Sequence, residues 1–106
     1  MMTLKAAFIF LTPEGNADIH RCEVVTESVS VVTCAVNSYQ AASELAATLV
    51  TQDITAIELC GGFGIEGVAQ VKKAVNGKAV IGVVRFDCHP GLQFSSGDML
   101  FDQNKA

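Results

Sequence analysis

Positively charged side chains are scarce in this chain of 106 residues, which has seven Lys plus Arg against eleven Asp plus Glu and a formal net charge of −4. The basic residues are also scattered along the chain: Lys5, Arg21, Lys72, Lys73, Lys78, Arg85 and Lys105. Binding to a phosphate backbone depends on clustered cations that release counterions. The composition therefore argues against a nucleic-acid partner.

Long hydrophobic runs are scarce as well, and we expect no secretion signal. The apolar run over residues 6–11 is too short for the apolar segment of a signal peptide, and no cleavage pattern follows it. The longest apolar runs fall well short of a membrane span. Four cysteines stand far apart without a C-x-x-C pair: Cys22, Cys34, Cys60 and Cys88. We expect reduced thiols, a cytoplasmic location and no membrane partner.

What the chain does have is apolar material. Half of the residues are hydrophobic and 17% are charged, and a chain of this length forms one domain, residues 1–106. So rich a core for so small a surface indicates that a second subunit covers part of the apolar surface. We therefore expect a homo-oligomer.

Strand and helix patterns alternate along the chain. Apolar and β-branched runs predict four strands, and stripes of apolar residues at helical spacing predict two helices. The strands are expected over residues 4–11, 29–36, 54–60 and 79–86, and the helices over residues 39–52 and 65–75. This alternation predicts a small α/β domain with a mostly parallel sheet in the order 2-1-3-4, flavodoxin-like, with helices packed on it. A ferredoxin-like α+β arrangement is the alternative.

The two remaining segments are harder to read. Residues 12–28 are polar and mixed, and their length suits a crossover between parallel strands. The tail over residues 92–101 contains a turn signal at 95–98, and we expect it to fold back over an edge of the sheet or over a neighbouring subunit.

The first candidate motif lies where the third expected strand ends: Glu58-Leu59-Cys60-Gly61-Gly62-Phe63-Gly64. Glycines let backbone amides turn toward a ligand, and the start of the following helix favours negative charge. We expect the turn at residues 61–64 to bind an anion, with Cys60 beside it as a ligand contact or a nucleophile. A tight turn between strand and helix, with Cys60 as a small buried filler, is the alternative.

The second candidate motif ends the fourth expected strand: Arg85-Phe86-Asp87-Cys88-His89-Pro90-Gly91. Strand alternation places Arg85 and Asp87 on one face, within reach of Glu58 if the strands are neighbours. Glu58 and Arg85 then form either a structural ion pair or a base beside an anion-binding cation. His89 is the second candidate for acid–base work, with Asp87 orienting its ring.

No cofactor or metal is expected. The dinucleotide order G-x-G-x-x-G and the phosphate loop G-x-x-x-x-G-K are both missing. Four side chains offer metal-ligand chemistry without a local spacing such as H-x-x-x-H: His20, Glu58, Asp87 and His89.

Together with the opening run over residues 5–10, these two motifs resemble a family of short bacterial proteins classed as a domain of unknown function. The likeness covers most of the chain, and residues 58–64 and 85–91 are its most specific parts. It implies a bacterial cytosolic protein and transfers no activity.

Two functional hypotheses follow. In the first, the chain binds a small anionic metabolite at the carboxyl ends of the strands, where Glu58, or His89 oriented by Asp87, moves a proton in a lyase or isomerase reaction. In the second, the chain is a non-catalytic structural or regulatory subunit that self-associates, and the same side chains form a closed network. An open concave rim favours the first hypothesis, and mutual pairing of these side chains favours the second.

Overall fold

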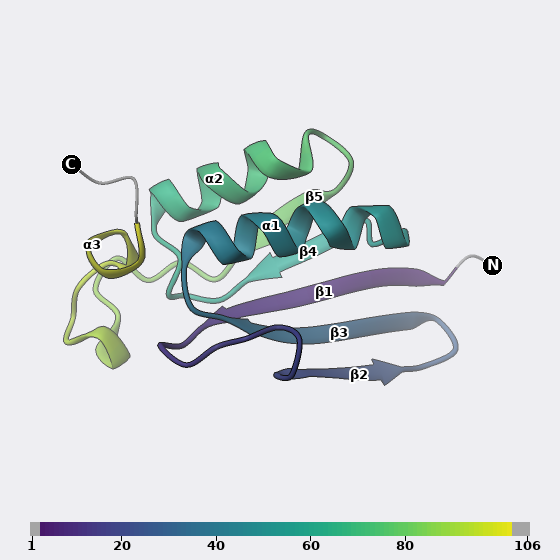
Figure 1. Cartoon of the computed structure of the whole chain (residues 1–106), viewed down its shortest axis with the longest axis horizontal. Helices are drawn as coiled ribbons and strands as arrows, with labels where there is room; N and C mark the ends of the chain where they lie inside the picture. Colours follow the sequence, from purple (N-terminus) through teal and green to yellow (C-terminus); the bar gives the residue numbers. More distant parts are fainter. Residues whose placement is uncertain (1–2, 103–106) are drawn as a thin grey trace.

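The computed structural model describes residues 3–102, which form a five-stranded sheet with its helices packed on one face (Figure 1). The strands are β1 (Leu4–Leu11), β2 (Arg21–Val25), β3 (Val29–Val36), β4 (Ala56–Leu59) and β5 (Val80–Val83). The helices are α1 (Tyr39–Leu49), α2 (Ile65–Val75) and α3 (Gly97–Phe101), with the short 3-10 helices η1 (Val50–Gln52) and η2 (Pro90–Leu92). Among these helices of the described chain, none is long and apolar enough to cross a membrane.

The strand order is β2-β3-β1-β4-β5. Four neighbouring strands, β3-β1-β4-β5, are parallel and stand in the predicted order, which rules out the ferredoxin-like alternative. The prediction of four strands was wrong, because residues 12–28 contain β2, which pairs antiparallel with β3. Thr26 closes this hairpin: its hydroxyl donates to the Val29 carbonyl at 2.8 Å and accepts from the Val29 amide at 3.0 Å.

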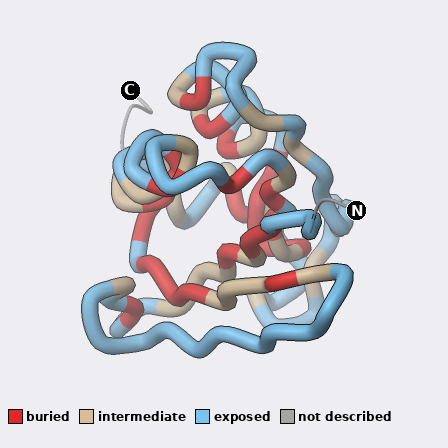
Figure 2. The backbone as a smooth tube through the Cα atoms, turned by 90° about the vertical axis from the view of Figure 1, so that its right-hand side faces the viewer, coloured by how far each residue is buried: buried red, intermediate tan, exposed pale blue. Residues whose placement is uncertain are grey.

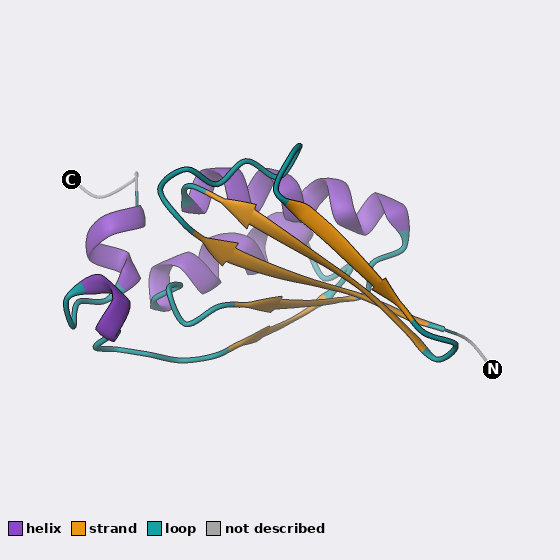
Figure 3. Ribbon diagram, turned by 90° about the horizontal axis from the view of Figure 1, so that it is seen from below, coloured by secondary structure: helices purple, strands orange, loops and turns teal. Residues whose placement is uncertain are grey.

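Both long helices lie on the same face of the sheet (Figure 3). The chain crosses from β3 through α1 to β4, and then from β4 through α2 to β5. Both crossovers move in the same direction across the sheet, and because such crossovers are right-handed, both helices lie on one side. A flavodoxin-like sheet has helices on both faces. Here the connection from β1 to β3 carries β2 instead of a helix, which leaves the second face open among the described residues.

The core fills the space between this one helical layer and the sheet (Figure 2). Alternate residues of the central strands point into it, among them the fully buried Ile9, Ile57 and Leu59. The two helices approach each other closely at Gly67, where a Cβ atom would lie 2.5 Å from the Tyr39 ring. Tyr39 is itself completely buried at the start of α1. Any larger residue at position 67 would therefore push the helices apart.

The C-terminal segment crosses the carboxyl ends of the strands and packs α3 against the start of α2 (Figure 1). The expected strand over residues 79–86 is shorter than predicted, although the Val84 amide still donates to the Leu59 carbonyl at 3.1 Å. The expected turn at residues 95–98 is the beginning of α3, capped by the Ser96 hydroxyl, which accepts from the Asp98 amide. The tail thus folds over the end of the sheet.

Candidate functional site

A cavity of about 910 Å³ opens at the carboxyl ends of β1, β3 and β4. We call it the rim cavity. Its lining residues are Leu11, Thr12, Pro13, Asn37, Cys60, Gly62, His89, Gly91, Leu92, Gln93, Ser95, Leu100 and Phe101. Ligands of open α/β sheets bind at this end of the strands, because the chain leaves the sheet there and exposes loop residues.

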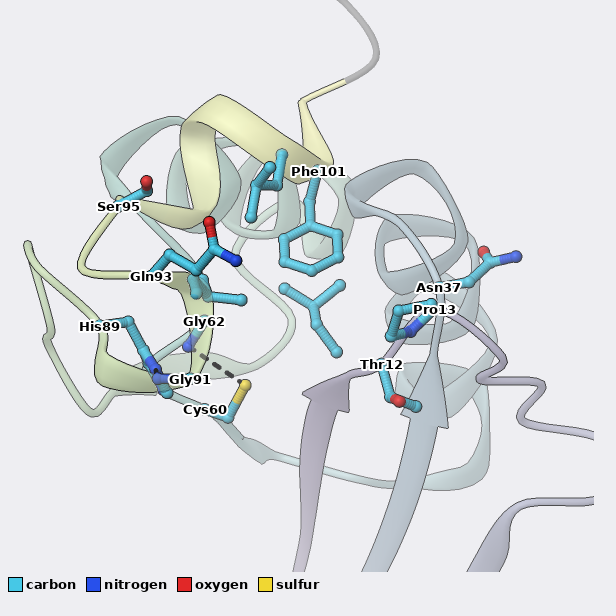
Figure 4. Close-up of a pocket in the computed structure, with 13 residues that line it drawn as sticks. Thr12, Pro13, Asn37, Cys60, Gly62, His89, Gly91, Gln93, Ser95 and Phe101 are labelled. Carbon is cyan, nitrogen blue, oxygen red and sulfur yellow. Dashed lines mark hydrogen bonds between the residues drawn. The ribbon is translucent and has the colours of Figure 1, made fainter.

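Two sets of segments face each other across the rim cavity (Figure 4). Thr12, Pro13 and Asn37 follow directly after β1 and β3 and form one side. Residues 89–95 form the other side, and Phe101 of α3 closes the top. The site therefore depends on the C-terminal segment, which lies far from β1 in the sequence.

Cys60 and Gly62 belong to the cavity wall contributed by the end of β4. The Gly62 amide donates a hydrogen bond to the Cys60 sulfur at 3.3 Å (Figure 4). A Cβ atom on Gly62 would lie 3.3 Å from that sulfur and 3.5 Å from Leu11 Cδ1, so it would point between two side chains of the wall. Because Gly62 has no side chain, the cavity wall keeps a gap between the side chains of Cys60 and Leu11.

His89 lines the cavity from the segment that follows β5 (Figure 4). Its Nδ1 accepts the Gly91 amide hydrogen at 2.9 Å, so the neutral ring carries its proton on Nε2 and can donate it to a ligand. The ring also packs on Phe86, with 4.9 Å between centroids. Asp87 was expected to orient this ring, but the Gly91 amide does so.

Asp87 is instead the partner of Arg85. The Arg85 Nε donates to Asp87 Oδ1 at 2.7 Å, and Nη2 lies 2.6 Å from the same oxygen. Both side chains are well exposed, so this ion pair adds little stability. Neither residue lines the rim cavity. The expected contact between Arg85 and Glu58 is not formed, because the nearer carboxylate on Arg85's own segment takes its place.

Glu58 points away from the rim cavity. It pairs in register with Phe8 of β1 and Gly82 of β5, on the sheet face opposite the helices. Among residues 3–102, no side chain forms a hydrogen bond or ion pair with its carboxylate. Of Glu58 and His89, the two side chains predicted to move a proton, and Asp87, predicted to orient the His89 ring, His89 alone lines the rim cavity.

All four residues of the turn at 61–64 are buried, and of these Gly62 lines the rim cavity. Phe63 is completely buried and stacks on Tyr39 with 5.5 Å between ring centroids. Gly61 lies beneath the Phe86 ring, which a Cβ atom would overlap at 2.1 Å. The alternative interpretation, a tight turn between strand and helix, describes Gly61 and Phe63 well.

An anion does bind at the start of α2, but it is the chain's own Asp98 from α3. Its Oδ1 accepts from the Tyr39 hydroxyl at 2.9 Å and from the Glu66 and Gly67 amides at 3.1 and 3.4 Å. The Tyr39 oxygen in turn accepts the Gly64 amide at 2.9 Å. The dipole and the first amides of α2 favour an anion, as expected, and the carboxylate of Asp98 is the anion that they bind.

Burial raises the pKa of the Tyr39 hydroxyl, and the hydrogen bond to Asp98 raises it further. The hydrogen bond that the Tyr39 oxygen accepts from the Gly64 amide lowers the pKa and so opposes this shift. Tyr39 thus stays a donor toward the carboxylate.

Sequence reasoning missed several residues of this end of the molecule: Thr12, Asn37, Tyr39, Gln93 and Asp98. A signal for one of them existed. Ser96 followed by Asp98 at the start of the C-terminal apolar segment is typical of a helix N-terminus. Within residues 3–102, no group of three His, Cys, Asp or Glu side chains is arranged to hold a metal ion.

The fold and the site define a two-layer α/β domain with a cavity at the carboxyl ends of its parallel strands. The chain belongs to a family described as "Family of unknown function (DUF6506)", whose model matches residues 4–99. Comparison of the chain with the curated proteins and with the solved structures finds no match. The functional argument therefore depends on the geometry.

Proposed function

We propose that the chain binds a small organic molecule in the rim cavity. The supporting observation is the cavity itself, whose volume of about 910 Å³ falls within the roughly 300–1,000 Å³ of small-molecule sites. Its wall is largely apolar, and a few polar residues from separate segments line it: Thr12, Asn37, His89, Gln93 and Ser95. Such a combination buries an apolar body and orients it through a few hydrogen bonds.

The proposed ligand is uncharged, in contrast to the anionic metabolite expected from the sequence. Among the described residues, no Asp, Glu, Lys or Arg lines the rim cavity. Both features that favoured an anion are satisfied within the chain, since Arg85 pairs with Asp87 and the start of α2 binds Asp98. A net charge of −4 also disfavours an incoming anion.

Catalysis by a lyase or isomerase mechanism would need a group that moves a proton. Of the lining residues, His89 supplies a ring that can donate its Nε2 proton to a ligand, and Cys60 supplies a thiol. These two side chains are the candidates for chemistry if the bound molecule is also a substrate. Glu58 has no part in this proposal, because it faces away from the cavity.

The test is a ligand-observed NMR screen with two libraries, one of uncharged fragments and one of carboxylates, on the native chain and two glycine variants. Gly62→Ala adds a methyl group to the cavity wall, and we expect it to weaken binding by about fivefold, corresponding to about 1 kcal/mol of crowding. Gly82→Ala is the matched control, because its Cβ atom meets nothing nearer than Glu58 Cγ at 3.9 Å on the opposite sheet face.

Thiol labelling provides a second readout of the same site. A fragment in the rim cavity should slow the modification of Cys60 and leave that of the exposed Cys22 on β2 unchanged. Hits that bind the Gly62 variant as well as the native chain, and that do not protect Cys60, would contradict the proposal. Binding confined to the carboxylate library would restore the anionic ligand in place of the uncharged one.

A further inference from the structure

The sheet face opposite the helices is apolar and unpartnered among the described residues. Its side chains follow from the register, because directly paired residues share a face. They are Cys22 and Val24 of β2, Val29, Val31, Thr33 and Ala35 of β3, Leu4, Ala6, Phe8 and Phe10 of β1, Ala56 and Glu58 of β4, and Val80 and Gly82 of β5. We call this surface the open face.

Large apolar side chains on the open face are in contact with solvent. Leu4 is 46% exposed, Val24 63% and Val80 71%. Phe8 and Phe10 are half-buried and stack with 6.5 Å between ring centroids. Monomeric proteins rarely leave a continuous apolar surface of this extent in water. A partner that buries it would gain the transfer free energy of the whole sheet face.

The size of the open face suits a dimer. With β1 and β3 of eight residues each and three shorter strands, it has a flat area of roughly 450 Å² at ~3.3 Å per residue and ~4.8 Å between strands. Side chains make the accessible surface larger than its flat projection. The face is therefore of the same order as the roughly 800 Å² that each partner contributes to a standard interface.

One row across the open face shows a pattern that a second copy would match. The register places Cys22, Thr33, Phe8, Glu58 and Gly82 side by side on five successive strands. Phe8 stands in the middle of this row, with a hydroxyl donor on one side and a carboxylate acceptor on the other. Thr33 of one copy could therefore pair with Glu58 of another copy, whereas Glu58 could not pair with a second Glu58.

We infer that two copies of this chain pack open face against open face, with a twofold axis that runs along β1 over Phe8. Rotation about this axis exchanges the two sides of the row. Phe8 then meets Phe8 of the partner subunit, and Glu58 meets Thr33 of the partner subunit. The carboxylate accepts a hydrogen bond from the threonine hydroxyl, and the symmetry repeats the contact on the other side.

This arrangement provides a partner for a charge that would otherwise be costly to bury. Glu58 is the one carboxylate among the side chains that form the open face, and burying a carboxylate without a hydrogen-bond donor costs free energy. The rows on either side are apolar, which suits sheets that pack about 10 Å apart with interdigitating side chains. The helices and the rim cavity remain on the outside of the dimer.

The experiment measures the dissociation constant of the dimer by sedimentation equilibrium for the native chain and two variants of one residue. Thr33→Glu places two carboxylates opposite each other at both symmetric contacts, and we expect about tenfold weaker binding per contact, or about a hundredfold in total. Thr33→Lys places an ammonium group opposite Glu58 of the partner subunit, so it should bind at least as tightly as the native chain.

Ala47→Glu and Ala47→Lys are matched controls, since Ala47 is exposed on α1, on the opposite side of the sheet. They should leave the dissociation constant unchanged, and circular dichroism should show all four variants folded. The inference is overturned if the chain stays monomeric at millimolar concentration, or if it binds a different protein and does not bind itself. A dimer that responds equally to both charges at Thr33, or to neither, overturns it as well.

Discussion

The carboxylate of Asp98 holds three parts of the molecule together, and its removal should be strongly destabilising. It accepts hydrogen bonds from the fully buried Tyr39 hydroxyl and from the amides of Glu66 and Gly67 at the start of α2. In the Asp98→Ala variant, the buried hydroxyl is left without an acceptor, which costs about 1–3 kcal/mol. The lost N-terminal cap costs a further 0.5–2 kcal/mol, roughly. We expect a total loss of about 3 kcal/mol.

Urea unfolding followed by circular dichroism measures this loss as a change in the midpoint at constant slope. Asp98→Asn keeps an oxygen in the same place and loses the charge, so it should cost less than the alanine variant, about 1 kcal/mol. Asp18→Ala is the control, because Asp18 lies exposed in the loop before β2 and should change stability by less than about 0.5 kcal/mol.

A double-mutant cycle with Tyr39→Phe isolates the contact itself. Because the phenylalanine variant no longer has a hydroxyl to satisfy, Asp98→Ala should cost about 1–2 kcal/mol less in that background. If Asp98→Ala were as stable as the Asp18 control, or if the two substitutions were simply additive, the view of Asp98 as the internal anion of α2 would be refuted.

Two further predictions concern buried ionisable groups. Tyr39 is the sole tyrosine in a chain without tryptophan, and its pKa is raised by burial in the folded state. The folded chain therefore keeps a proton that the unfolded chain loses, so the free energy of unfolding should fall as the pH rises above the ordinary tyrosine pKa. Tyrosinate absorbance that develops at that ordinary pKa while the chain is still folded would contradict this. Burial likewise raises the pKa of the Cys34 thiol, so a thiol reagent should modify exposed Cys88 at once and Cys34 only on unfolding, as mass spectrometry would show. Equal rates for the two thiols would exclude a protected Cys34.

Local patterns were sufficient for the parallel part of the sheet. The apolar runs and helical stripes identified four parallel strands in their observed order, because the side-chain period and the right-handed crossover depend on nearby residues. They also led to the carboxyl ends of those strands, where Cys60, Gly62 and His89 line the rim cavity. The polar segment over residues 12–28 hid β2, because a five-residue exposed strand has no hydrophobic period to detect.

The partners of the charged groups could not be predicted in the same way. Arg85 had two carboxylates within reach, and the choice of Asp87 over Glu58 depends on how the chain turns after β5. Asp98 comes to the amide of Glu66 from 32 residues further along the chain. No periodicity links positions so far apart, since their meeting depends on the path of the whole C-terminal segment.

By itself, then, the amino-acid sequence determined the α/β class, the order of the parallel strands and the end of the strands at which polar residues gather. The tertiary structure alone decided that the anion at the start of α2 is internal, that His89 and Cys60 share a cavity, and that Glu58 lies on an open sheet face. The physical reason is one of range. Secondary structure follows from burial patterns a few residues long, whereas an ion pair, a helix cap or a cavity wall joins groups that only the completed fold brings within a few ångströms.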